Sequence, residues 1–582
     1  MARKARKAEA PRGAGKAPAG TERRAKGRRW AWLLAGLGAL WLTLEAYGPA
    51  LKGPFLFDDW YLPFTRPGLA EAPLRYWLGQ IRPLLMLSYW INFRLWGLNP
   101  YPYHLFNILF HFAAAVFVFL AAEKLLAMSG EEGARRRLFA GFVAGLFLWH
   151  PLQTESVAYV ASRSEALSGM FFYAALALFL RRRSAAISWP AAAGVLLVYG
   201  AAVLSKEHTA VLAGLLLLTD YFWNPGFSLR GVRQNWRLYA PLALGAAAAL
   251  RFVWNILRSS DSAGFGIREF TWQQYFLTQC RALWLYLRMF VAPYGQNLDH
   301  DFAISRRPEA GALLGLAGLA LAVAAAIYWR KRYPLAAYGW LAALLTLAPT
   351  SSVVPLLDPV AERRMYLALP WLALALVEPL RRWRTTPPRL AAALGLVLLA
   401  AGGLSWRRNQ VWSDPIELWR DAAAKSPRKQ RPHFQLAYAY YQEGRCREAL
   451  PHYARAAELG PADYRLLADW ALACDCAGRP EEALEKLRAA AALENTAHAH
   501  ALMGMIHGKH GRPQAALEEL AIAERLDPRF EMTYVYRGNV YLAAGDRAAA
   551  AGQYRRALQI NPRNEAARQG LTQADSGPEG AR

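Results

Sequence analysis

The hydrophobic positions of this sequence form long unbroken runs in its first two thirds and short periodic groups in its last third. Runs of membrane-spanning length recur from about residue 30 to about residue 405 and then cease. The first run, Trp30 to Pro49, follows a basic stretch far longer than the n-region of a cleaved signal peptide, so we expect a retained anchor with a cytoplasmic N-terminus. Further runs predict spans at residues 104–127, 138–150, 165–180, 187–205, 208–223, 238–256, 310–329, 335–349, 365–380 and 389–405. The pattern predicts an all-α membrane domain over residues 30–405 with about eleven spans.

Basic clusters in the short loops predict the orientation of these spans. The clusters are Arg135 to Arg137, Arg181 to Arg183, Arg330 to Arg332, and Arg381 to Arg384. All four are cytoplasmic by the positive-inside rule if the stretch Phe276 to Pro293 lies on the outer face as an interfacial helix. The chain after Ser405 then lies outside the cytoplasm. The net charge of +26 fits this pattern better than nucleic-acid binding, because much of it lies in the cytoplasmic tail, residues 1–29.

After a linker over residues 406–426, the sequence repeats itself. Glycines recur at intervals of 34, 33 and 34 residues, and five positions after each stands an alanine. The four pairs are Gly444 and Ala449, Gly478 and Ala483, Gly511 and Ala516, and Gly545 and Ala550. With the helix-ending prolines Pro461, Pro528 and Pro562, this spacing matches the tetratricopeptide pattern, whereas a long coiled coil would be broken by these residues. We expect an α-solenoid over residues 427–570 and a disordered tail over residues 571–582.

Such a solenoid offers a concave surface for a peptide or a partner protein, although the repeats could instead serve as a spacer or an oligomerisation arm. Exposure of Tyr438, Tyr440, Tyr441 and Tyr534 in the groove would favour peptide binding. The repeat register also places Cys446 at the start of one helix and Cys474 or Cys476 at the end of another, at the same end of the stack. A disulfide between Cys446 and either partner is therefore expected in an oxidising compartment.

Ionisable residues of the membrane half gather on its predicted outer side. The first outer loop holds Asp58 and Asp59 between aromatic residues, and the last outer loop holds Asp358. The other members are His150, Glu155, Arg163, Glu165, Lys206, Glu207, His208, Asp299, His300, Asp301, Glu362, Arg363 and Arg364. Charged residues at helix ends are costly unless they pair or line a wet cavity, so we expect an outward-facing chamber. For any one residue, a local ion pair is the alternative.

The chemistry of these residue types indicates group transfer at a membrane surface. A carboxylate beside aromatic residues can act as a general base toward a hydroxyl, and Arg and Lys hold phosphate. Together these features predict transfer from a lipid phosphate to an acceptor outside the cytoplasm. Candidates for donor phosphate or substrate binding are Arg163, Lys206, Glu207, His208, Glu362, Arg363, Arg364, His150, Glu155 and His300. Asp58 and Asp59 with His150, His208 or His300 could instead bind a divalent metal, but no H-E-x-x-H pair is present, and no cofactor is assigned.

Several strings of the membrane half resemble those of one family. They are Asp58-Asp59, Arg82-Pro83-Leu84, Gly97-Leu98-Asn99-Pro100, Tyr103-His104-Leu105-Phe106-Asn107, His150-Pro151-Leu152-Gln153-Thr154-Glu155, Ser205-Lys206-Glu207-His208 and Ala361-Glu362-Arg363-Arg364-Met365-Tyr366-Leu367. The family is the transmembrane and tetratricopeptide repeat-containing O-mannosyltransferases with their bacterial homologues. The resemblance implies a GT-C fold and transfer of a sugar, with mannose as the candidate, from a polyprenyl-phosphate donor to protein hydroxyls. It also implies that Asp58 or Asp59 is the general base and that Lys206, Arg163, Arg363 and Arg364 face the donor phosphate.

Two other functions remain open from the sequence. An O-antigen ligase or oligosaccharide transferase also joins a multispan half to such repeats, but such enzymes generally lack a carboxylate pair in the first outer loop. A non-catalytic membrane scaffold would recruit partners through the repeats. In each case we expect a multi-pass protein of the cytoplasmic membrane, in contact with membrane lipids, with its repeats outside the cytoplasm and no nucleic-acid partner.

Overall fold

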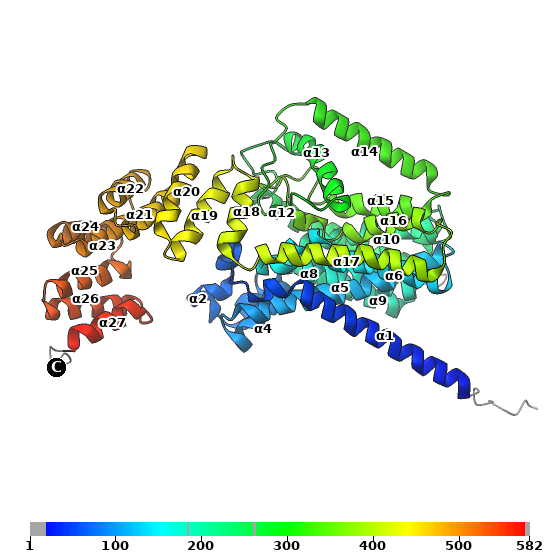
Figure 1. The fold of residues 1–582 in the computed structure, drawn as a ribbon, viewed down its shortest axis with the longest axis horizontal. Helices are drawn as coiled ribbons and strands as arrows, with labels where there is room; N and C mark the ends of the chain where they lie inside the picture. Colours follow the sequence, from blue (N-terminus) through cyan, green and yellow to red (C-terminus); the bar gives the residue numbers. More distant parts are fainter. Residues whose placement is uncertain (1–18, 183–185, 260–262, 577–582) are drawn as a thin grey trace, which may run out of the picture. The chain divides into compact units, whose positions relative to one another are not determined.

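The computed structural model describes residues 19–182, 186–259 and 263–576, and these residues form helices joined by loops (Figure 1). No strand occurs in these ranges, where the only bridge joins Ala263 to Leu356. The predicted all-α class is therefore confirmed for the described chain. The predicted cytoplasmic tail lies outside the described residues up to residue 18, as do Arg183 and the end of the chain from residue 577.

The chain divides into two compact units. The first contains residues 1–259, 316–353 and 363–410, and the second contains residues 260–315, 354–362 and 411–582. This division places the end of the first unit close to the predicted boundary at residue 405, but it also assigns two inner segments to the second unit. The domain boundaries drawn from the sequence stay a prediction.

The first unit is a bundle in which α5 (Pro100–Met128) packs against α6 (Gly133–Trp149) and α8 (Arg163–Arg182). Around these lie α1 (Ala19–Ala46), α4 (Pro83–Trp96), α9 (Trp189–Ser205), α10 (Leu212–Trp223), α12 (Trp236–Ser259), α15 (Pro334–Leu347), α16 (Leu369–Leu380) and α17 (Pro387–Val411). Small residues set the closest helix contacts. A Cβ on Gly339 in α15 would lie 2.4 Å from the carbonyl oxygen of Trp371 in α16, so only glycine fits at this crossing.

Three helices of the described chain are long and apolar enough to cross a membrane, namely α5, α14 (Ala310–Trp329) and α17. Shorter apolar helices are Leu33–Ala46, α9, α15 and α16. A helix needs roughly 20 residues to cross the hydrocarbon core, and many helices of the first unit end sooner at polar turns. The larger number of spans predicted from hydropathy is therefore not confirmed by helix length and composition.

The second unit contains α13 (Trp272–Val291), which covers most of the predicted interfacial segment Phe276 to Pro293. One side of α13 is buried. On this helix, the side chain of Gln279 donates a hydrogen bond to the carbonyl oxygen of Pro359, and the hydroxyl of Tyr286 donates one to the carbonyl oxygen of Ala361. The helix is thus amphipathic, as an interfacial helix requires, and its apolar side is covered by protein. Its placement at a membrane surface stays a prediction.

The repeats form helix pairs after α18 (Pro415–Lys425). They are α19 (Gln430–Gln442) with α20 (Cys446–Leu459), α21 (Tyr464–Cys476) with α22 (Pro480–Leu493), α23 (Ala497–Lys509) with α24 (Pro513–Leu526), and α25 (Glu531–Ala543) with α26 (Arg547–Ile560), followed by α27 (Glu565–Asp575). The turn glycines Gly444, Gly478, Gly511 and Gly545 have φ between 70° and 83°, the left-handed region that favours glycine. Ala449, Ala483, Ala516 and Ala550 are fully buried where the paired helices meet. The helix α27 includes residues 571–575 of the expected disordered tail.

A disulfide joins Cys446 at the start of α20 to Cys476 at the end of α21, with the Cα atoms 5.9 Å apart. Of the two partners left open by the sequence, the structure selects Cys476, whereas Cys474 is a buried free thiol. The tyrosines give less support to a peptide groove than expected, because Tyr440 and Tyr534 are buried. Tyr534 donates a hydrogen bond to the carbonyl oxygen of Pro528, which gives it a role within the repeat.

Candidate active site

The loop that carries Asp58 and Asp59 is a short 3-10 turn, Phe57–Tyr61, between α1 and the helices that follow it. Phe57 has φ 43°, a left-handed conformation that is uncommon for a residue with a bulky side chain. The backbone N–H of Asp58 donates to the Tyr159 hydroxyl at 2.7 Å, which holds the turn against residues 150–162. A strained residue immediately before a carboxylate is typical of functional sites, where the surrounding structure maintains the strain.

The two neighbouring carboxylates lie in opposite environments. Asp59 is fully buried, and its two carboxylate oxygens accept hydrogen bonds from the backbone N–H groups of Leu56, at 2.8 Å, and Ala161, at 2.6 Å. Burial raises the pKa of Asp59 to about 8, although both hydrogen bonds act in the opposite direction. Asp58 is exposed. The structure thus separates a carboxylate that fixes the loop, Asp59, from one that a substrate can reach, Asp58.

The turn after α6 connects this loop to a second charged group. The carboxylate of Glu155 is buried and accepts hydrogen bonds from Arg363, one from the backbone N–H at 3.0 Å and one from Nη1 at 2.5 Å. The guanidinium of Arg363 is partly exposed and lies within electrostatic range of the Tyr159 hydroxyl. His150 accepts a hydrogen bond at Nδ1 from the backbone N–H of Leu152, and it is buried. Its ring therefore shapes the turn.

Arg163, a predicted phosphate ligand, is fully buried. Its guanidinium donates from Nε to Oδ1 of Asn107 at 2.8 Å and from Nη2 to the carbonyl oxygen of Tyr103 at 2.9 Å. It also lies 4.5 Å from the ring centroid of Tyr89, in cation–π geometry. These contacts give Arg163 a structural role at the start of α8, so we do not include it among the phosphate ligands proposed below.

Two ion pairs lie on the other side of Arg363. Lys206 contacts Glu165 at 2.5 Å, and Glu165 also faces Nε2 of His208 at 3.5 Å. Arg82 makes a bidentate pair with Glu207, from Nε at 2.9 Å and from Nη2 at 2.5 Å. Burial alone would raise the pKa of Glu207, but the hydrogen bonds from Arg82 override it and lower that pKa to about 2. Burial has the larger effect at Lys206 and lowers its pKa, despite the nearby carboxylates.

The cations of this group differ in their access to solvent. The side chains of Arg82 and Arg363 are 34% and 31% exposed, whereas that of Lys206 is 15% exposed. Arg363 acts electrostatically on both Glu165 and Lys206, so the three cations belong to one continuous site. We name Arg82, Lys206 and Arg363, with their partners Glu155, Glu165 and Glu207, the cation cluster. Arg364 lies in the same short turn as Arg363 and is partly buried.

Two residues of this site, Arg82 and Tyr159, are not among those predicted from the sequence. Arg82 stands directly before the proline that begins α4, within a string quoted for the family resemblance. Tyr159 carries no comparable signal, because the contact that makes it important joins it to Asp58, 101 residues earlier in the chain.

The remaining candidates belong to the second unit. His300 lies 3.1 Å from the carboxylate of Glu362, which also accepts a hydrogen bond from the backbone N–H of Asn297 at 2.5 Å. Asp299 pairs with Lys429 and with Nε of Arg431. These groups satisfy one another and connect residues 297–301 to the first repeat helix. The structure therefore brings some of the predicted site residues together in the first unit and gives His300 and Glu362 partners in the second.

No group of three or more His, Cys, Asp or Glu side chains within the described ranges is arranged to hold a metal ion. Asp58 and Asp59 do not form a bidentate pair, since both oxygens of Asp59 accept backbone hydrogen bonds. His150 uses Nδ1 on its own turn. The geometry gives no support to the metal alternative at these residues.

Comparison with known proteins identifies relatives of both halves. The tetratricopeptide repeat family matches residues 532–564. The chain is 25% identical over 538 residues to the human protein O-mannosyl-transferase TMTC1, a match that covers 77% of this chain and 56% of the relative. It is 30% identical over 181 residues to human protein O-mannosyl-transferase TMTC3, covering 31% of this chain and 18% of that protein. Human protein O-mannosyl-transferase TMTC2 is 33% identical over 146 residues, covering 24% of this chain and 16% of the relative.

Among solved structures, the chain is similar to YrrB, described as a TPR protein with an unusual peptide-binding site. The sequence identity is 19% and the TM-score is 0.24, and the match covers 31% of this chain and 89% of that one. The match to TMTC1 spans little more than half of that relative's length. The resemblance expected from the motif strings is confirmed: the chain is similar over most of its length to a protein O-mannosyl-transferase, and its C-terminal region contains a tetratricopeptide repeat.

Proposed function

We propose that this chain is an integral membrane glycosyltransferase that moves a sugar, with mannose as the candidate, from a polyprenyl-phosphate donor to an acceptor hydroxyl at the outer face of the cytoplasmic membrane. Similarity to named O-mannosyl-transferases supports the reaction class. The observation that carries the proposal is the placement of Asp58, an exposed carboxylate held on a strained turn by Asp59 and Tyr159.

Asp58 is the general base of the proposed reaction. Its carboxylate takes the proton of the acceptor hydroxyl as the oxygen attacks the anomeric carbon of the donor sugar. The bond between that carbon and the phosphate oxygen breaks, and the polyprenyl phosphate leaves with the electron pair. A single displacement of this kind inverts the anomeric configuration. A base must lie within hydrogen-bond reach of the hydroxyl, which an exposed side chain allows and the buried Asp59 does not.

The cation cluster stabilises the leaving phosphate in this proposal. Arg82 and Arg363 are partly exposed, and their carboxylate partners hold them in fixed positions before a donor arrives. Preorganised cations that face developing negative charge are an effective source of transition-state stabilisation. Lys206, more deeply placed, adds charge to the same site.

We further propose that the acceptor is a protein and that the tetratricopeptide repeats bind the acceptor or a partner of it. The repeat family match supports a protein-binding role for this region. The proposed location is the cytoplasmic membrane, with about eleven spans and the repeats outside the cytoplasm.

The experiment compares glycosylated envelope proteins by mass spectrometry in cells that lack the protein and in cells complemented with Asp58→Asn, Asp59→Asn or Glu71→Gln. Glu71 is an exposed carboxylate of the same unit and serves as the matched control. We expect Asp58→Asn to lower transfer by about 100-fold or more at unchanged protein level, as loss of a general base does. We expect Asp59→Asn to lower both activity and protein stability, and Glu71→Gln to lower neither.

An unchanged glycan profile in the deletion strain would contradict any transferase role. Full function of both Asp variants, together with loss of function on removal of residues 412–582, would favour a membrane scaffold. Loss of glycan transfer in the deletion strain, with full transfer in both Asp variants, would favour an O-antigen ligase or oligosaccharide transferase.

A further inference from the structure

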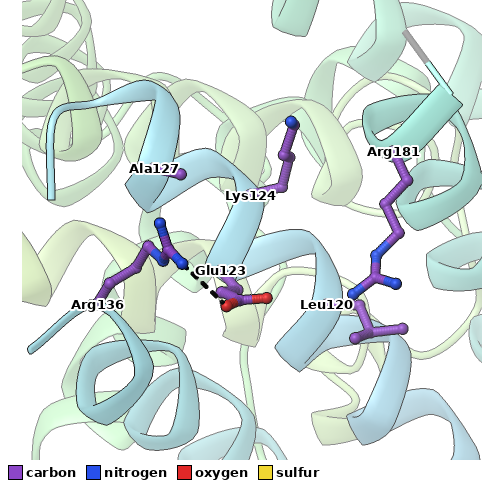
Figure 2. Close-up of a pocket in the computed structure, with 6 residues that line it drawn as sticks. All are labelled: Leu120, Glu123, Lys124, Ala127, Arg136 and Arg181. Atoms are coloured by element: carbon purple, nitrogen blue, oxygen red, sulfur yellow. Dashed lines mark hydrogen bonds and ion pairs between the residues drawn. The ribbon is translucent and has the colours of Figure 1, made fainter. Parts of the chain in front are cut away.

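A polar cavity lies in the first unit, formed by three helix ends that the proposed reaction does not use. Its volume is about 560 Å³, and it is lined by Leu120, Glu123, Lys124 and Ala127 of α5, Arg136 of α6 and Arg181 of α8 (Figure 2). This volume is within the usual range of sites for small ligands. The lining contains three cationic side chains and one carboxylate, so the cavity is basic.

The charged groups of this cavity are only partly satisfied by one another. Arg136 pairs with Glu123 through Nη2 at 3.5 Å, and the two side chains are 29% and 26% exposed. Within the part of the chain that the structure describes, the buried Nε of Arg136 has no hydrogen-bond partner. The pair with Glu123 therefore leaves part of the donor capacity of the Arg136 guanidinium unused.

The cavity lies beside the C-terminal end of α5. At 29 residues, α5 is about 43 Å long, which exceeds a hydrocarbon core of about 30 Å. Glu123 and Lys124 are its only acidic or basic residues apart from its two histidines, and both stand in its last two turns. Arg136 and Arg181 come from the two basic clusters that the positive-inside rule assigns to the cytoplasmic side.

We propose that this cavity binds the phosphate group of an anionic phospholipid from the cytoplasmic leaflet. Lys124, Arg136 and Arg181 supply the charge for the phosphate, which guanidinium and ammonium groups bind well. Leu120 and Ala127 of α5 present apolar surface beside these cations, which suits the glycerol and upper acyl region of a lipid and not a free phosphate ion. Basic pockets between membrane helices on the cytoplasmic side are typical of such sites.

The test uses the full-length protein purified in a neutral detergent. Two quantities are measured: the melting temperature of the protein, and the lipid adducts that it forms in native mass spectrometry. Each is measured with dioleoylphosphatidylglycerol, with dioleoylphosphatidylcholine and with sodium phosphate alone. One variant carries both Lys124→Gln and Arg181→Gln. The matched control is the single variant Arg137→Gln. Arg137 follows Arg136 directly on α6 and carries the same charge, but it does not line the cavity.

We expect phosphatidylglycerol to raise the melting temperature and to form a one-to-one adduct, and we expect phosphatidylcholine to do neither. The apparent affinity for phosphatidylglycerol should fall by about tenfold or more in the double variant and stay within about twofold in Arg137→Gln. A separate Arg181→Lys variant should retain binding, which distinguishes loss of charge from a folding defect.

Three outcomes would overturn the proposal. Equal stabilisation by the two lipids would show that the headgroup charge is not recognised. Full stabilisation by sodium phosphate, with no further effect of phosphatidylglycerol, would assign the cavity to a soluble anion. An equal loss of affinity in Arg137→Gln and in the double variant would show general attraction to the basic face rather than binding in the cavity.

Discussion

At the scale of single residues, the most informative pair is Asp58 and Asp59. They have the same side chain and adjacent positions, yet one is exposed and the other is fully buried between two backbone donors. The hydrogen bond from Ala161 joins residues 102 positions apart, so Asp59 anchors the first loop to the turn after α6. We therefore expect Asp59 to affect stability, whereas the proposed role of Asp58 is toward a substrate.

Stability should depend on pH through Asp59. The folded-state pKa of Asp59 is raised to about 8 by burial, whereas the unfolded chain has the ordinary value of about 4. A raised pKa means that the folded state holds its proton more tightly. The stability that this proton contributes is fully present below pH 4 and is lost as pH rises through 8. Asn cannot titrate, so the melting-temperature difference between wild type and Asp59→Asn should shrink from pH 5 to pH 8.5.

The measurement is thermal unfolding of both full-length proteins in the same detergent at pH 5, 7 and 8.5. The variant Glu71→Gln is the control, because it leaves Asp59, its neighbouring charges and its two backbone hydrogen bonds in place. A constant difference between wild type and Asp59→Asn over this range would contradict a raised pKa for Asp59.

At the scale of elements, the repeats were predictable in detail because their determinants are local. The pair formed by Gly444 and Ala449 is repeated three more times along the chain at a nearly fixed interval. In the structure, each of these glycines adopts a left-handed turn and each alanine is buried. The active-site pairs were not predictable in this way. Glu155 and Arg363 are 208 residues apart, and Arg82 and Glu207 are 125 apart, so no local pattern identifies the partners. Adjacent identical residues such as Asp58 and Asp59 likewise give no sequence signal of which is buried.

Helix packing in the last repeat predicts opposite effects for two glycines. A Cβ on Gly538 of α25 would lie 2.6 Å from the ring of Tyr554, which is fully buried and donates a hydrogen bond to Oδ1 of Asn539. Gly538→Ala should therefore destabilise the repeat by about 1–3 kcal/mol. Gly552 of α26 is exposed with nothing near its absent Cβ, so Gly552→Ala should stabilise it by about 0.5–1 kcal/mol.

Hydrogen exchange of the backbone amides of α25 and α26 in the full-length protein measures both changes locally. Protection should fall in Gly538→Ala and rise slightly in Gly552→Ala. Unchanged protection in Gly538→Ala would show that the ring of Tyr554 has room to move, and that the repeat is packed less closely than the structure indicates.

At the scale of the whole molecule, the open question is the side of the membrane on which each part functions. Helix length and composition identify α5, α14 and α17 as able to cross, which by itself does not fix the orientation. Two independent features bear on it. The basic clusters assign one set of loops to the cytoplasm, and the disulfide between Cys446 and Cys476 requires an oxidising compartment for the repeats.

Both features predict that the chain after α17 is outside the cytoplasm. A reporter enzyme that folds only in the periplasm, fused at residue 410, should be active, and one that functions only in the cytoplasm should be inactive. Thiol labelling of denatured protein from intact cells should then label Cys474, whereas Cys446 and Cys476 should not react. In the control variant Cys476→Ser, Cys446 should become reactive. A cytoplasmic reporter signal together with three free thiols would place the repeats inside. It would also remove Asp58 from the outer face, because the predicted orientation of every loop depends on the same alternation of spans.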